Sequence, residues 1–158
     1  MTDANAPAAG PAAMFSDHAA IDFGTSNSAI ALCAAGGSGA VELVELEPGW
    51  ATMPTAVFYR VDSEHGWAPP VVSFGRTALA EYVQGHDGRL MRSMKSILGS
   101  SLVEQSTDVG GGHSVRYRDV ITGYLRHLRT LAEQRAGRPL RRALLGRPVH
   151  FVDDDPAR

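Results

Sequence analysis

The sequence predicts a single soluble domain of the α/β class. Its 158 residues are 44% hydrophobic and 20% charged, a composition typical of globular domains and unlike that of disordered, collagen-like or membrane-spanning chains. Short apolar runs separated by small polar turns fill residues 19–61, which favours strands. Apolar residues recur at helical spacing in residues 117–132, which favours a long amphipathic helix.

The N-terminal segment is expected to lie outside the folded domain. Residues 1–13 consist largely of Ala, Pro and Gly, and they lack the basic and apolar regions of a secretory signal peptide. They predict a disordered leader before an ordered region over residues 14–158. Met14, directly before that region, is an alternative start of the chain.

Charge and cysteine content favour a cytoplasmic protein without a nucleic-acid or membrane partner. The formal net charge is only −2, and Cys33, the single cysteine, cannot form an intramolecular disulfide. Cys33 is expected to be an inert thiol in the core. The histidines His113, His127 and His150 share no metal-ligand spacing, and His127 is expected at the surface. The arginines of residues 126–142 lack interleaved aromatic residues and are interpreted as a solvated helix face and loop.

Four strands are predicted in the first part of the chain. Residues 19–34 have the pattern of a tight hairpin with buried strands, and residues 41–47 alternate apolar and acidic side chains. A fourth strand is expected over residues 55–61, followed by a polar loop over residues 62–70. We expect these strands to form one antiparallel or mixed sheet.

Helices dominate the predicted second part. Helical spacing of apolar residues indicates a short helix within residues 74–85, a second over residues 89–98 and the longest over residues 117–132. The glycines of residues 110–112 are expected to form a flexible connector.

The C-terminal residues predict one more strand and the start of a helix. Residues 142–146 and 148–152 have the pattern of a strand interrupted near Pro148. Asp153, Asp154 and Asp155 before Pro156 are typical of a helix N-terminus.

The most informative segment is the turn of the first hairpin. Asp22 ends an apolar strand, and Gly24, Thr25, Ser26 and Asn27 follow it. Glycine permits close approach of the backbone, N–H and hydroxyl groups can bind phosphate oxygens, and Asp22 can hold Mg²⁺ directly or through water. The same spacing also suits an ordinary hairpin in which the aspartate caps local N–H groups.

Two nucleotide-binding folds are excluded by what accompanies this turn. The tripeptide at residues 22–24 matches the Mg²⁺-binding motif of protein kinases, but the upstream glycine-rich loop and the catalytic-loop motif are missing. The chain also contains no GxxxxGK[ST] sequence, so it carries no P-loop.

Three segments in the same order resemble the seventy-kilodalton heat-shock (DnaK-type) branch of the actin, hexokinase and heat-shock-chaperone ATPase superfamily. The segment AIDFGTSNSAIAL at residues 20–32 resembles its first phosphate-binding motif. Residues 74–76 with the helix after them, and then residues 92–99 (RSMKSILG), are similar to the segment that carries the family's catalytic lysine. Residues 145–151 (LGRPVHF) look like a family strand, in the form of the divergent YegD-type proteins.

The resemblance implies a ribonuclease-H-like first lobe of an ATP-dependent molecular chaperone, with a smaller inserted subdomain at about residues 55–115. Lys95 takes the role of the catalytic lysine that reaches the γ-phosphate and the attacking water, and Asp22 belongs to the Mg²⁺ shell. Gly24, Thr25, Ser26 and Asn27 supply the phosphate contacts. The implied cofactors are ATP and Mg²⁺, and a longer form of the protein would bind unfolded client proteins.

The match covers only the first part of a nucleotide-binding domain. The second phosphate loop, the adenosine-binding segment and the substrate-binding domain of the family have no counterpart in residues 1–158. Phe23 and Ser26 also stand where the family commonly has a smaller or aliphatic residue and a threonine. The chain is therefore expected to be a fragment or truncated form that is inactive without the second lobe. The alternatives are a non-catalytic binding module that keeps the hairpin, and a sugar-kinase or actin-like relative.

Overall fold

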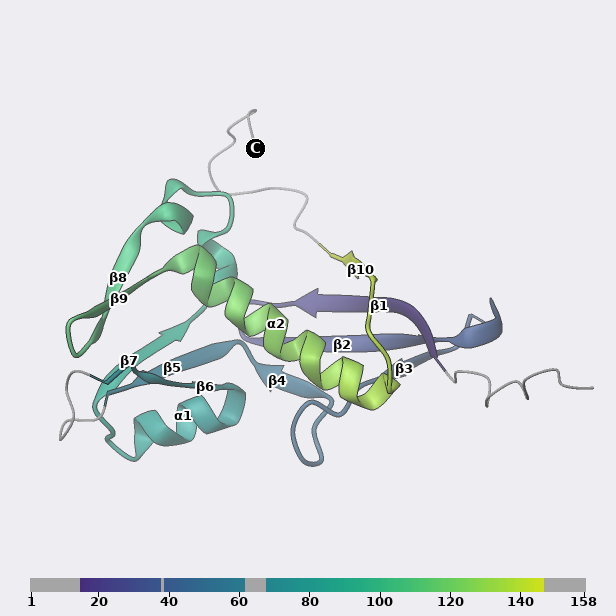
Figure 1. The fold of residues 1–158 in the computed structure, drawn as a ribbon, viewed down its shortest axis with the longest axis horizontal. Helices are drawn as coiled ribbons and strands as arrows, with labels where there is room; N and C mark the ends of the chain where they lie inside the picture. Colours follow the sequence, from purple (N-terminus) through teal and green to yellow (C-terminus); the bar gives the residue numbers. More distant parts are fainter. Residues whose placement is uncertain (1–14, 38, 62–67, 147–158) are drawn as a thin grey trace, which may run out of the picture.

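The computed structural model describes residues 15–37, 39–61 and 68–146 (Figure 1). The predicted leader over residues 1–13, the alternative start at Met14, the strand continuation over residues 148–152 and the helix start at residues 153–156 lie outside the described residues. The described part is a mixed α/β structure, as predicted, with two helices and three sheets.

The largest sheet contains the predicted hairpin. Its strand order is β10-β1-β2-β3, and β4 pairs with β2 beyond the end of β3. The hairpin strands are antiparallel, whereas β10 runs parallel to β1. The strands are β1 (Phe15–Phe23), β2 (Asn27–Ala34), β3 (Val41–Leu43), β4 (Thr52–Pro54) and β10 (Arg142–Leu145).

A second unit lies between β4 and the long helix. The strand β5 is the centre of an antiparallel sheet of order β6-β5-β7, and helix α1 packs against β5, while β8 and β9 form a separate hairpin. The elements are β5 (Ala56–Arg60), β6 (Val71–Phe74), α1 (Gly75–Val83), β7 (Gly88–Arg92), β8 (Ser106–Gly110) and β9 (His113–Arg116). The short 3₁₀ helices are η1 (Ala35–Gly37), η2 (Met94–Ile97) and η3 (Ser101–Glu104).

Several predicted elements in this region were wrong. Residues 55–61 form a strand, but it belongs to the second sheet and not to the sheet of the hairpin. Residues 89–98 are not a helix. They form β7, in which Met91 pairs with Val57, and then the 3₁₀ turn η2. Ser93 lies between them with a φ of 55°, and this left-handed residue ends the strand and starts the turn. The strands β6, β8 and β9 were not predicted.

Glycines explain another difference from the prediction. Residues 110–112 are not a flexible connector but the tight turn of the β8–β9 hairpin, and all three have positive φ values of 96°, 60° and 75°. Consecutive residues adopt this conformation without strain only as glycine. The predicted strand over residues 41–47 is also shorter, since β3 ends at Leu43.

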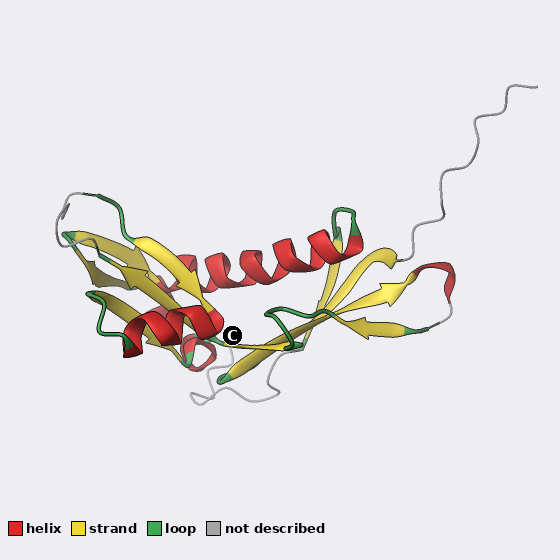
Figure 2. Ribbon diagram, turned by 90° about the horizontal axis from the view of Figure 1, so that it is seen from below, coloured by secondary structure: helices red, strands yellow, loops and turns green. Residues whose placement is uncertain are grey.

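Helix α2 (Tyr117–Ala136) is the predicted amphipathic helix, and it covers one face of the large sheet (Figure 2). Ile30 and Leu32 of β2 are buried in the core that Val120, Ile121, Tyr124 and Leu128 of α2 also form. The helix ends at Gly137, whose φ of 66° forms a left-handed C-cap.

The opposite face of the same sheet is apolar as well. Leu144, Ala20, Ala31 and Leu43 form one row across β10, β1, β2 and β3. Leu144 is 76% exposed and Leu43 59% exposed, and no helix of the described residues covers this face. Apolar side chains on both faces are typical of a sheet that lies between two layers.

Two side chains lie in other surroundings than predicted. Cys33 is half-buried on β2 and is therefore not a core thiol. His127 is not at the surface, since its ring is half-buried and stacks on Phe74 with 4.4 Å between the ring centroids. Burial lowers the pKa of His127 below its ordinary value, although the charge of Glu47 partly opposes this effect.

The two sheets are linked by contacts at the start of α1. The carboxylate of Glu47 accepts a hydrogen bond of 2.7 Å from the backbone N–H of Arg76, and it forms an ion pair with the Arg76 guanidinium. The same guanidinium lies 4.1 Å above the ring of Trp50. The chain before β4 therefore holds the N-terminus of α1.

Three hydroxyl groups meet where β2, the β4–β5 connection and α2 come together. The Ser28 and Thr55 side chains form a buried hydrogen bond of 2.8 Å. The Tyr124 hydroxyl donates to the Pro54 carbonyl at 3.0 Å and lies 3.3 Å from that of Met53. Burial raises the pKa of Tyr124, and hydrogen bonds from Ser28 and Thr55 partly oppose that shift. We call Ser28, Thr55 and Tyr124 the hydroxyl cluster.

Removal of one hydroxyl from this cluster should destabilise the fold. Tyr124→Phe keeps the ring but leaves buried polar groups without their partner, and we expect it to lower the free energy of unfolding by about 1–3 kcal/mol. Urea denaturation measures this change. Tyr82→Phe is the matched control, because the Tyr82 side chain is 56% exposed and forms no hydrogen bond among the described residues, so its effect should be negligible. Equal stability of both variants and the unmodified chain would contradict the role of the cluster.

Candidate functional site

The candidate phosphate-binding turn joins β1 to β2. Phe23 and Ser28 are the last paired residues of the hairpin, and residues 24–27 connect them. The residues Thr25, Ser26 and Asn27 are exposed, whereas Gly24 is half-buried. The turn therefore presents its polar groups to solvent at the end of a buried hairpin.

Backbone N–H groups of this turn are free to bind a ligand. Those of Thr25 and Ser26 donate to no acceptor within the described part of the chain. Both residues also carry hydroxyl groups. Adjacent free N–H groups in a turn form a local concentration of positive partial charge, which is suited to an anion.

Gly24 is required by the shape of the turn. A Cβ atom at this position would overlap the backbone carbonyl oxygen of Asn27. Because the obstacle is backbone and not a flexible side chain, any larger residue must displace the turn. Gly24, which was predicted to allow close approach of a ligand, thus also allows the backbone of Asn27 to lie against it.

The hydroxyl cluster and the neighbouring strand brace the turn from behind. The Thr55 N–H donates to the carbonyl oxygen of Ser26 at 2.9 Å, and Asn27 is paired with Pro54 of β4. Ser28, the first residue after the turn, is only 1% exposed and bonds to Thr55. The turn is therefore held on a rigid support, although it is itself exposed.

Asp22 lies next to this turn and points away from α2. It follows Ala20 on the same face of β1, the face that no described helix covers, and it pairs with Ala29. The side chain is exposed and forms no hydrogen bond or ion pair with the described residues. Its carboxylate is thus available beside the free N–H groups of the turn.

Lys95 lies in the 3₁₀ turn η2, next to a buried anchor. Met94 is 2% exposed and belongs to the same core as Phe23, which precedes Gly24. The Leu98 N–H donates to the Lys95 carbonyl at 3.2 Å, so the backbone of this turn is fixed. The side chain is half-buried, and no hydrogen bond or ion pair within the described residues joins it to Asp22 or to the turn.

The sequence did not predict the residues that brace the turn. Ser28 was predicted as the last residue of the polar hairpin turn, Thr55 as the start of a strand in the same sheet and Tyr124 as an apolar position of the long helix. Apart from the hydroxyl of Tyr124, Ser28 and Thr55 carry the only polar side chains that are fully buried among the described residues.

The donor set fits a magnesium ion only if the ligand and water complete its shell. No group of three or more His, Cys, Asp or Glu side chains in the described ranges could hold a metal ion. Asp22 supplies one carboxylate, and Mg²⁺ commonly binds one or two carboxylates together with phosphate oxygens and water. The described residues alone therefore supply one carboxylate and no complete metal shell.

Comparison with known proteins gives no family for this chain. It matches no protein-family model, and no curated protein matches its sequence. No helix within residues 15–37, 39–61 and 68–146 is long and apolar enough to cross a membrane.

Substitution of Gly24 should disturb the turn. We expect Gly24→Ala to lower the free energy of unfolding by roughly 1–3 kcal/mol, because the Asn27 carbonyl must move away from the new methyl group. Thermal or urea denaturation measures the change. Gly123→Ala is a control of opposite sign: a Cβ at Gly123 meets nothing within 4 Å. This substitution within α2 should add about 0.5–1 kcal/mol. A neutral Gly24→Ala variant would show that the turn is not closed as described.

Proposed function

We propose that this chain is the first lobe of an ATP-binding, ATP-hydrolysing protein related to the DnaK-type chaperones, and that the turn over residues 24–27 binds nucleotide phosphates. The observation that carries the proposal is the pair of N–H groups of Thr25 and Ser26, two exposed residues on a braced hairpin turn, which have no acceptor among the described residues and lie next to Asp22. Free N–H groups favour phosphate oxygens, and the carboxylate favours the Mg²⁺ that accompanies them.

The sheet supports a ribonuclease-H-like arrangement. Three antiparallel strands, β1 to β3, are followed by a helix and by β10, which runs parallel to β1 at the sheet edge. The unit with strands β5 to β9 lies between β4 and α2. In this proposal it is the inserted subdomain expected over residues 55–115. In this proposal the large sheet positions the phosphate turn.

Lys95 is the proposed catalytic residue. A lysine near the γ-phosphate accelerates transfer to water by stabilising negative charge and positioning the nucleophile. Met94 beside it is buried, so in this proposal Lys95 approaches the nucleotide by rotation of its side chain and not by movement of the η2 backbone. Gly24, Thr25, Ser26 and Asn27 hold the phosphates, and Asp22 holds Mg²⁺ through its waters.

The uncovered apolar face supports the proposal that the complete protein contains a further lobe. Leu144, Leu43 and Val41 are 76%, 59% and 62% exposed, and the row through Ala20 and Ala31 lies between β10 and β3. We propose that the remainder of a nucleotide-binding domain packs on this side, and that binding of client proteins belongs to that longer, cytoplasmic form. With half of the cleft, residues 1–158 should bind ATP weakly.

Titration calorimetry tests the proposed site. Mg²⁺-ATP should bind this chain with a dissociation constant on the order of 0.1–1 mM, and Asp22→Asn should remove most of the dependence of that affinity on Mg²⁺. Asp119→Asn is the matched control. Asp119 is also an exposed carboxylate, in the first turn of α2 and remote in sequence from the phosphate turn, and its variant should bind as the unmodified chain does.

Outcomes of this titration separate the proposals. Equal loss in both aspartate variants would indicate a nonspecific charge effect and contradict the Asp22 site.

Lys95→Ala should keep the binding affinity but abolish ATP turnover in a form with both lobes. Binding without any turnover in that longer form would favour the alternative of a non-catalytic binding module.

A further inference from the structure

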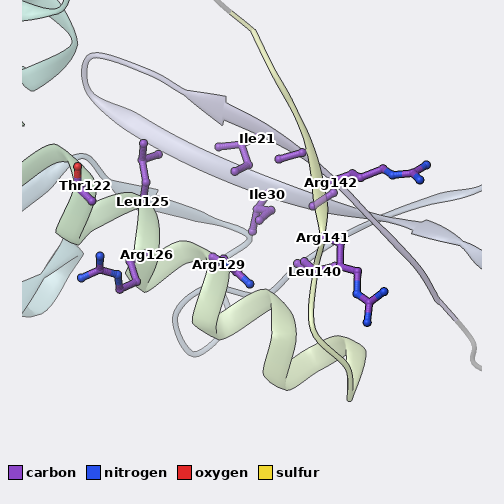
Figure 3. Close-up of a pocket in the computed structure, with 11 residues that line it drawn as sticks. Ile21, Ile30, Thr122, Leu125, Arg126, Arg129, Leu140, Arg141 and Arg142 are labelled. Carbon is purple, nitrogen blue, oxygen red and sulfur yellow. The ribbon is translucent and has the colours of Figure 1, made fainter.

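A groove lined by arginine lies on the α2 side of the sheet, separate from the phosphate turn. It has a volume of about 410 Å³ and lies between α2, the strands β1 and β2, and the segment that leads into β10. Its lining contains aliphatic side chains from all of these elements and no aromatic one; they include Ile21, Ile30, Leu125 and Leu140 (Figure 3). Asp22 points to the opposite face of the sheet, so this arginine groove is not part of the nucleotide site proposed above.

One carboxylate holds two walls of the arginine groove together. The Glu133 side chain accepts hydrogen bonds from the Leu140 N–H at 2.8 Å and from the Arg129 guanidinium at 2.9 Å. On the sheet side, the Arg141 N–H donates to the carbonyl oxygen of Asp17 at 3.0 Å. The segment that leads into β10 is therefore bonded both to α2 and to β1, and the groove between them is formed without a ligand, as sites for small molecules usually are.

Four arginines and no acidic side chain line this groove. Arg126 and Arg129 come from α2, whereas Arg141 and Arg142 come from the segment leading into β10 and its first residue (Figure 3). Arg129 is paired as described above, and Arg142 lies 3.3 Å from the His18 ring. The guanidinium groups of Arg126 and Arg141 form no hydrogen bond or ion pair with the described residues. Two cations of the groove thus lack a partner.

An aliphatic floor beside unpartnered guanidinium groups favours a small anion with an aliphatic body. An uncharged apolar ligand would leave the cations without partners, and an inorganic anion would leave the floor uncovered. A carboxylate matches the planar guanidinium group and can accept two parallel hydrogen bonds from it. The volume lies near the lower end of the range of roughly 300–1,000 Å³ for small-molecule sites, which favours one small ligand over a protein partner.

We propose that the arginine groove binds an aliphatic carboxylate of medium chain length. The guanidinium groups of Arg126 and Arg141 bind the carboxylate, and the aliphatic chain covers Ile21, Ile30 and Leu125. The site does not depend on the nucleotide site, because it lies on the other face of the sheet and uses none of the residues assigned there.

Titration of the ¹⁵N-labelled chain with octanoate, followed by its amide chemical shifts, tests this site. The largest shift changes should occur at Ile30, Leu125 and Arg141. Octanol is the matched uncharged ligand, since it has the same chain length and no carboxylate. Octanoate should bind roughly tenfold more tightly than octanol, because hydrogen bonds between charged groups contribute about that factor.

Arginine variants separate the charge contribution from the apolar one. Arg126→Gln together with Arg141→Gln should lower the affinity for octanoate roughly tenfold and leave that for octanol unchanged. Arg118→Gln is the control, since Arg118 is exposed on the same helix but does not line the groove, and this variant should bind both ligands as the unmodified chain does. Arg126 and Arg141 are also exposed, so their replacement leaves the core intact.

Three results would overturn the proposal. They are equal affinities for octanoate and octanol, equal effects of the groove variant and Arg118→Gln, and the largest shift changes at Leu43 and Leu144 on the uncovered face of the sheet. Asp22→Asn should bind octanoate as the unmodified chain does. Failure of the nucleotide site would therefore leave the octanoate result unchanged, and the two proposals can fail separately.

Discussion

The buried hydrogen bonds of Ser28, Thr55 and Tyr124 are the constraint on which the rest of the structure depends. They join the first hairpin, the connection between the two sheets and the long helix at one point. Since buried hydroxyl groups without partners are costly, each of the three segments is held in one position by the other two. The exposed turn after Phe23 is attached to these segments, because the Thr55 N–H donates a hydrogen bond to the Ser26 carbonyl.

The large sheet separates two surfaces of different chemistry. On the α2 side, the core closes around Tyr124 and Leu128, and at its margin lies the arginine groove, which Arg126, Arg129, Arg141 and Arg142 line. The other side carries Asp22 together with the apolar row through Ala20 and Ala31.

The sequence predicted the hairpin, α1, α2 and β10 because their signals are local. Alternation, helical spacing and the Gly137 cap depend on neighbouring residues alone. Residues 89–98 were misread because Met91, Met94 and Ile97 have helical spacing, yet the left-handed Ser93 divides them into a strand and a 3₁₀ turn. The support of the turn could not be predicted, since Ser28, Thr55 and Tyr124 are separated by up to 96 positions and meet only through tertiary packing. The roles of Asp22 and Lys95 came from a resemblance and stay predictions.

The most direct test of the phosphate turn is paramagnetic broadening of backbone amide signals by Mn²⁺-ATP. Bound Mn²⁺ broadens the nuclei closest to it, and so the spectrum reports where the nucleotide sits. Our account predicts the strongest loss of signal at Asp22, Thr25 and Ser26, with the amides of the arginine groove unaffected. The strongest loss at Arg126 and Arg141, or a uniform loss over the surface, would contradict it and identify nonspecific binding of the anion instead.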